Sequence, residues 1–267
     1  MARNATVAGR FYPGTRSALQ GEIERFTAND VPKEEVIGVV SPHAGYIYSG
    51  LVAGTTFSRV NIKDTCVILG PNHTGQGYPA SIMVNGSWET PLGEVEIDSD
   101  LAIQILNNSE YLEEDEIAHV YEHSIEVQLP FLQYFKKDVK IVPIVLAYSD
   151  STVYKEIGSS IARAVRETGR ETVIVASSDM THYESQESAK SKDMKAIQAI
   201  LDLDEDALFN RIKDLKISMC GYAPTISMIR AAKRLGAQET ELVQYQTSGD
   251  VSGDYTRVVG YAGVIIK

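Results

Sequence analysis

Short apolar runs rich in β-branched residues alternate with helix-forming segments along the chain, and this alternation constrains the fold more than any other feature. The runs "VIGVV", "TCVILG", "KIVPIVL" and "ETVIVA" are short and continuous, as strands buried on both faces are. Helical spacing follows two of them, over residues 49–60 and 151–169. Alternating strands and helices form a sheet with helices on both faces. We therefore expect a single α/β domain over residues 1–267 with a mixed, mostly parallel central sheet.

Turn and cap signals refine this outline. "ASIMV" and "GEVEID" are separated by turn-forming residues, and we expect them to pair as a hairpin. Ser49 is expected to cap the helix over residues 49–60, and Asp98 or Ser99 to lie near the cap of a helix over residues 98–108. Gly169 should end the helix over residues 151–169. Pro130 should kink or interrupt a helix over residues 123–137. The Gly- and Asp-rich residues 247–256 favour a turn between strands over a loop that closes a binding site.

The charge balance excludes some classes of partner. The chain has 25 Lys and Arg against 36 Asp and Glu, a net charge of −11. This disfavours nucleic acids and anionic membranes, which attract proteins through basic patches. The chain also lacks an apolar run of roughly 20 residues and a secretory signal. Its two cysteines are typical of a reducing compartment. We therefore expect a cytoplasmic protein with no nucleic-acid or membrane partner.

Three apolar runs each lead into a histidine. "VIGVVSPH" ends at His43, "TCVILGPNH" ends at His73, and "ETVIVASSDMTH" carries Asp179 and His182. Ligands of α/β sheets bind beyond the carboxyl ends of the strands. If these strands run parallel, the four side chains share one edge of the sheet. Because neutral imidazole is the commonest side-chain metal ligand, we interpret this edge as a metal site.

Cys220 is the third candidate ligand. It lies in "ISMCGYAPT", just before a predicted helix. A helix start and a metal both lower the pKa of a thiol, and the thiolate is the form that binds metal. The alternative is an inert buried thiol. Asp179 and His182 would complete the site, either as ligands or by orienting the ligating imidazoles.

The segment "EHSIEVQ" is unusually polar ahead of the apolar "LPF". His123 and Glu126 are spaced to share one helical face, with Glu122 and Gln128 close by. This segment either faces the site or is the polar first turn of a helix. His119 has no such neighbours, and we expect it on the surface. The motifs of P-loops, of α/β-hydrolase nucleophiles and of zinc peptidases are all absent from the sequence.

Six motifs in order resemble the MEMO family: "AGRFYPG", "PHAGYIYSG", "GPNHTG", "EHSIEVQLPF", "SSDMTHY" and "MCGYAPT". The resemblance spans nearly the whole chain. It implies a fold similar to the catalytic subunit of the LigB-like class III extradiol dioxygenases, which are non-heme iron enzymes. It also implies a pocket built from two histidines, an aspartate, a further histidine and a cysteine. These match His43, His73, Asp179, His182 and Cys220.

The resemblance further implies that His43, His73 and Cys220 bind iron or copper, with zinc as the alternative, and that the protein has redox activity. His182 and Asp179 would be its catalytic residues. Animal members of the family bind phosphotyrosine peptides with the help of a tryptophan. Prokaryotic members are often encoded beside radical-SAM and AMMECR-type proteins, which implies functional partners.

The tryptophan of the animal members is Phe11 in this chain, and we expect Phe11, His123 and Glu126 to contact the substrate. Three functions stay open from the sequence: a metal-dependent oxidoreductase, a non-catalytic module that binds a small molecule or peptide, and a metal-assisted hydrolase.

Overall fold

A nine-stranded sheet forms the centre of the computed structural model, which describes residues 2–28 and 30–267. Four parallel strands lie in its middle, in the order β2 (Gly38–Ser41), β9 (Thr172–Ser177), β3 (Thr65–Pro71) and β8 (Lys140–Leu146). Beyond β2, β12 (Val258–Ile266) is antiparallel and pairs with β10 (His182–Glu184) and β11 (Thr240–Thr247). Beyond β8 come antiparallel β4 (Ala80–Ile82) and then β7 (Glu113–Glu114). The expected mixed sheet is confirmed.

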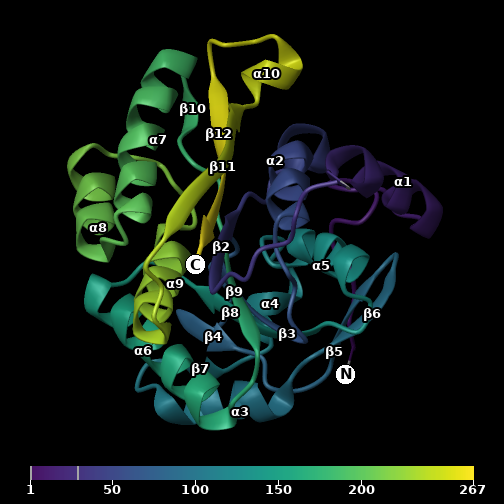
Figure 1. The fold of residues 1–267 in the computed structure, drawn as a ribbon, viewed down its shortest axis with the longest axis vertical. Coiled ribbons are helices and arrows are strands. Elements are labelled where there is room, and N and C mark those ends of the chain that lie inside the picture. Colours follow the sequence, from purple (N-terminus) through teal and green to yellow (C-terminus); the bar gives the residue numbers. More distant parts are fainter. Residues whose placement is uncertain (1, 29) are drawn as a thin grey trace.

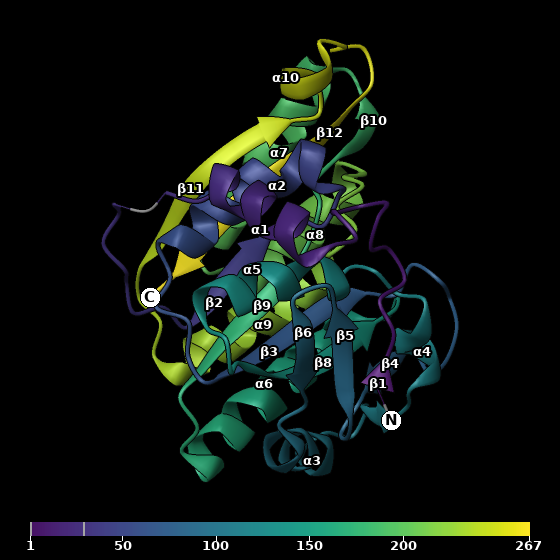
Figure 2. The same cartoon turned by 90° about the vertical axis from the view of Figure 1, so that its right-hand side faces the viewer.

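Helices cover both faces of this sheet (Figures 1 and 2). One face packs against α3 (Ser99–Asn108) and α9 (Tyr222–Leu235), and α6 (Ser151–Thr168) packs against both of these helices. This layer continues into α7 (Gln186–Leu201) and α8 (Glu205–Asp214). The other face packs against α2 (Tyr46–Ser58), which contacts α1 (Arg16–Phe26) and α5 (Leu129–Phe135). The short helices are α4 (Ile117–Val120), η1 (Glu126–Gln128) and α10 (Gly249–Ser252). A small separate sheet comprises β1 (Ala2–Arg3), β5 (Ser87–Thr90) and β6 (Gly93–Glu96).

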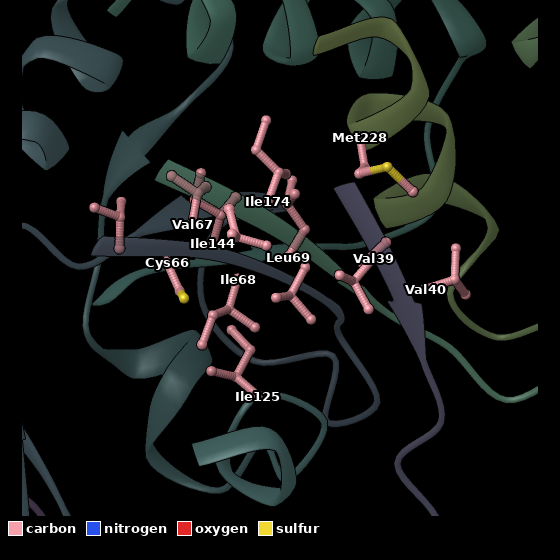
Figure 3. Close-up of a cluster of buried hydrophobic side chains, with 14 of the residues drawn as sticks. Val39, Val40, Cys66, Val67, Ile68, Leu69, Ile125, Ile144, Ile174 and Met228 are labelled. Atoms are coloured by element: carbon pink, nitrogen blue, oxygen red, sulfur yellow. The ribbon is translucent and has the colours of Figure 1, made fainter. Parts of the chain in front are cut away.

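The core sits on both sides of the parallel strands (Figure 3). Successive side chains of β3 alternate between the two faces, so Cys66 and Ile68 lie opposite Val67. All three are fully buried. The helix α9 packs close to β2, because a Cβ added at Gly38 would lie 2.5 Å from the sulfur of Met228. The parallel pairing of the four central strands brings their carboxyl ends to one edge.

Several local expectations are confirmed. Asp98 caps α3 by accepting a hydrogen bond from the Leu101 amide, and α6 ends at Gly169, whose φ is 64°. Residues 247–256 connect β11 to β12 and include the short helix α10. In the described chain, no helix combines the length and the apolar content needed to cross a membrane.

Other expectations are corrected. The hairpin joins β5 to β6, whereas Ala80–Ile82 pairs with β8 in the main sheet. The helix α2 starts at Tyr46, so Ser49 lies inside it and its hydroxyl donates to the Ala44 carbonyl. Pro130 lies in the first turn of α5, where a missing amide hydrogen removes no helical bond, and the helix therefore begins there.

His119 is fully buried rather than on the surface. Its ring packs edge-on against Trp88, with centroids 6.0 Å apart, and its carbonyl accepts a hydrogen bond from Arg3. The small sheet carries both Trp88 and Arg3, so remote segments bury this histidine.

Candidate functional site

Three imidazoles meet beyond the carboxyl ends of the parallel strands. His43, His73 and His123 each offer a ring nitrogen, and these atoms lie within 4.8 Å of one another. We call these three side chains the imidazole group. Their ring centroids are 4.7–5.6 Å apart. His43 follows β2 and His73 follows β3, with β9 between the two strands, whereas His123 precedes η1. Parallel strands therefore place two of the three, and a loop from elsewhere adds the third.

The tautomer of His43 follows from a chain of buried hydrogen bonds. The Ser177 hydroxyl donates its hydrogen to the Ser124 carbonyl at 2.7 Å and accepts one from Gln128 Nε2 at 2.8 Å. It also lies 2.9 Å from His43 Nδ1. Since its single hydrogen is already committed, it must accept from His43 Nδ1–H. The Nε2 atom of His43 therefore carries the free lone pair.

Burial keeps the His43 ring neutral. Its side chain is almost fully buried, and burial, followed by the other imidazoles nearby, lowers the pKa of His43 well below its usual range. A neutral ring with a free Nε2 lone pair is the form that binds a metal.

Glu122 orients His73. Its Oε2 accepts the His73 backbone amide at 2.6 Å, and its Oε1 lies 2.9 Å from His73 Nδ1. The Ser124 amide also donates to Oε1. Burial opposes ionisation, but the hydrogen bond and charge of His73 outweigh it and lower the pKa of Glu122 to about 2. Burial alone would lower the pKa of His73, but the hydrogen bond and charge of Glu122 outweigh burial. The pKa of His73 is therefore raised. With Nδ1 held by the carboxylate, Nε2 is the nitrogen left for a ligand.

His123 completes the group and contacts Phe11. Its ring stacks on His73 with planes 22° apart, and Phe11 meets it edge-on at 4.9 Å. Its Nδ1 lies 3.5 Å from Glu122 Oε1, beyond a good hydrogen bond. Burial lowers the pKa of His123, with the Glu122 charge acting against this shift.

Cys220 contacts the imidazole group through His43. Its Sγ lies 3.2 Å from His43 Nε2 and accepts a hydrogen bond from the Asp179 amide at 3.3 Å. Gly221 allows this approach, because a Cβ there would lie 2.3 Å from the Ser177 carbonyl oxygen. Burial, and then the Asp179 charge, raise the pKa of the Cys220 thiol well above its usual range. The lowering of this pKa expected from the helix start is therefore outweighed by burial.

Asp179 and His182 occupy the same region but are not hydrogen-bonded to each other in the described structure. The Asp179 carboxylate accepts the His43 backbone amide at 2.8 Å, and burial raises its pKa. His182 is instead held by Ser218. The His182 Nδ1–H donates to the Ser218 carbonyl at 2.9 Å, and the His182 backbone amide donates to the Ser218 hydroxyl. Asp179 therefore positions the turn that carries His43, and Ser218 orients the His182 ring.

Glu126 is turned away from the imidazole group. Its carboxylate pairs with Arg3 at 2.6 Å and accepts the Tyr12 hydroxyl at 2.7 Å. It also accepts the amides of Thr6 and Val7. This buried carboxylate therefore anchors the N-terminal segment, and the structure does not bring it to the other site residues.

Sequence reasoning did not assign roles to Ser177, Ser218, Glu122 and Gln128. The polarity of "EHSIEVQ" ahead of an apolar run was the available signal for Glu122 and Gln128, which are fully buried. A buried polar side chain needs a hydrogen-bond partner, but only the folded chain shows that the partners are site residues.

The sequence matches a known protein family along nearly its whole length. The sequence profile of the Memo-like protein family matches residues 3–265. A MEMO1 family protein of Methanococcoides burtonii is 48% identical over 267 residues, covering 99% of this chain and 100% of the relative. One from Nitrosopumilus maritimus is 42% identical, covering 99% of each.

A solved structure shares the fold. The uncharacterized protein JW3007 from Escherichia coli K12 aligns with a TM-score of 0.55 at 12% identity, over 86% of this chain and 99% of that one. At this identity the likeness concerns the fold alone.

Proposed function

The chain belongs to the Memo-like protein family, and we propose that it is a metal-dependent oxidoreductase in which His43, His73 and Cys220 hold iron or copper. One observation carries the proposal. Buried partners occupy Nδ1 of both histidines, so each ring offers Nε2, and the Cys220 sulfur lies 3.2 Å from that atom of His43.

The donor set suits a transition metal. Imidazole binds copper, iron and zinc, and a thiolate favours the softer ions among them. The Glu122 carboxylate behind His73 is the partner that raises the basicity of a ligating imidazole. His123 is the additional nitrogen donor of the group. When bound, iron or copper would supply the electron-transfer chemistry of the proposed oxidoreductase.

The remaining residues have separate roles in this proposal. His182 is the acid or base, because its Nδ1 donates to the Ser218 carbonyl and leaves Nε2 free to exchange a proton. Asp179 holds the backbone of His43 in place. Phe11 and His123 form the wall that a substrate meets. A cytoplasmic setting belongs to the proposal, since a reducing compartment keeps the Cys220 thiol free.

Metal binding is tested first. Purified protein is loaded anaerobically with Fe(II), Cu(I) or Zn(II), and metal content and affinity are measured for wild type, His43→Ala and Cys220→Ser. His119→Phe is the matched control, because His119 is a buried histidine that lies outside the imidazole group. We expect both site variants to lose the metal and the control to keep it. Equal metal content in His43→Ala and wild type would overturn the proposed ligand set.

Turnover is tested second, on the loaded protein. Oxygen consumption with catechols or thiols supports the oxidoreductase. Ester hydrolysis by the zinc form without oxygen consumption would replace it with a metal-assisted hydrolase. Tight binding of a small molecule or peptide to metal-free protein, with no turnover of either kind, would replace it with a binding module.

A further inference from the structure

A cavity lies farther along the same edge of the sheet as the imidazole group. It has a volume of about 390 Å³ and opens at the carboxyl end of β8, where the chain passes Leu146 and Ala147. Its other walls come from the segment before β4, the segment before β7 and the first turn of α6. The volume is in the range of small-molecule sites. Neither the imidazole group nor Cys220 lines it, so it is separate from the site described above.

Three tyrosines line this cavity, which we call the tyrosine cavity. Tyr154 is buried, and its hydroxyl is fixed between the Ser149 amide and the Ala147 carbonyl. Its ring is therefore a rigid wall. Tyr78 and Tyr111 are 54% and 44% exposed. This exposure leaves their rings available to a ligand that enters the cavity.

Two carboxylates complete the lining. Glu110 and Glu113 both border the tyrosine cavity, and neither forms an ion pair with another described residue. No lysine, arginine or histidine is present along the described wall. The rest of the wall is mainly apolar, with Pro79, Leu146 and Val153 among its residues.

We propose that the tyrosine cavity binds an organic ammonium ion. The faces of phenol rings attract cations electrostatically, and alkylated ammonium ions are the ligands that aromatic cages select. The negative charges of Glu110 and Glu113 also attract a cation. The apolar wall accommodates alkyl groups, which a hydrated metal ion would not need. An anion would be repelled by both carboxylates. The proposal does not rest on metal binding at the imidazole group.

The test compares a cation with its neutral counterpart. Choline and 3,3-dimethylbutan-1-ol have the same shape, but only choline carries a charge. Each is titrated into the full-length protein and followed by NMR chemical shifts or calorimetry. We expect saturable choline binding and at least about tenfold weaker binding of the alcohol. Equal affinity for the two, or no saturation by choline at millimolar concentrations, would overturn the proposal.

Variants locate the binding. Tyr111→Ala and the double change Glu110→Gln with Glu113→Gln should each weaken choline binding about fivefold or more. Glu114→Gln is the matched control, since Glu114 neighbours Glu113 in β7 but does not line the cavity. These side chains lie at the surface, and an unchanged circular dichroism melt verifies that the variants fold. Wild-type affinity in both cavity variants would contradict the assignment.

Discussion

The Glu122 carboxylate binds His73 at two points, with Oε2 accepting the backbone amide at 2.6 Å and Oε1 facing ring Nδ1 at 2.9 Å. This double contact fixes both the turn after β3 and the direction of the ring. Glu122 is fully buried, so water cannot replace it. The availability of His73 Nε2 thus depends on a residue that is no ligand itself.

Replacing Glu122 should weaken metal binding. In Glu122→Gln the amide is a poorer partner for Nδ1–H and lowers the basicity of the ring. We expect metal affinity to fall about 10- to 100-fold, measured by competition with a chelator. An unchanged affinity would show that the carboxylate does not tune the site.

Replacing Glu126 should lower stability without weakening metal binding, which makes it the matched control for Glu122. Both are fully buried glutamates of one segment. Glu126→Gln leaves the Arg3 guanidinium buried without its counter-charge, and we expect a loss of about 3–5 kcal/mol in the free energy of unfolding. Metal affinity of the folded protein should not change. Chemical denaturation and metal titration of the same sample measure the two quantities.

Removing the Ser177 hydroxyl should release the His43 tautomer. In Ser177→Ala, Nδ1 loses its acceptor, and the proton is no longer confined to that nitrogen. We expect metal affinity to fall about tenfold. Thr181→Val is the control from the segment that directly follows β9, because the Thr181 hydroxyl has no hydrogen-bond partner among described residues. A loss of equal size in both variants would point to general disruption at the end of β9.

The Glu122–His73 pair should make stability depend on pH in acid. The folded-state pKa of Glu122 is lowered to about 2 from an ordinary value of 4.5. Its contribution, on the order of 3 kcal/mol, is therefore present above pH 4.5 and lost as the pH falls towards 2. Unfolding free energies of wild type and Glu122→Gln should converge over this interval. A constant difference between them would contradict the lowered pKa.

Near neutral pH, the titrations of His73 and His43 should change the stability of the fold in opposite directions. The pKa of His73 is raised, so its contribution is complete below pH 6.5 and is lost as the pH rises through the raised value. The pKa of His43 is lowered, so the fold loses stability as the pH falls below 6.5, because only the unfolded chain takes up this proton there. NMR titration of the two rings in metal-free protein should show them ionising in that order, His73 at the higher pH.

Local patterns in the sequence predicted much of the framework. β-branched runs identified the central strands, and their ends carried His43 and His73 to one edge of the sheet. Asp98 and Gly169 marked the start of one helix and the end of another. Such features depend on backbone preferences and on neighbours within a few residues, so the sequence alone was sufficient to determine them.

Tertiary structure decided which polar side chains meet. Glu122 and Glu126 belong to one short segment, yet one binds His73 and the other binds Arg3 near the N-terminal end of the described chain. His119 appeared solitary and is buried against Trp88. Spacing along the chain cannot distinguish these outcomes. A buried polar group takes its hydrogen-bond partner from whichever segment packs beside it, and that choice exists only once the remote parts of the chain have come together.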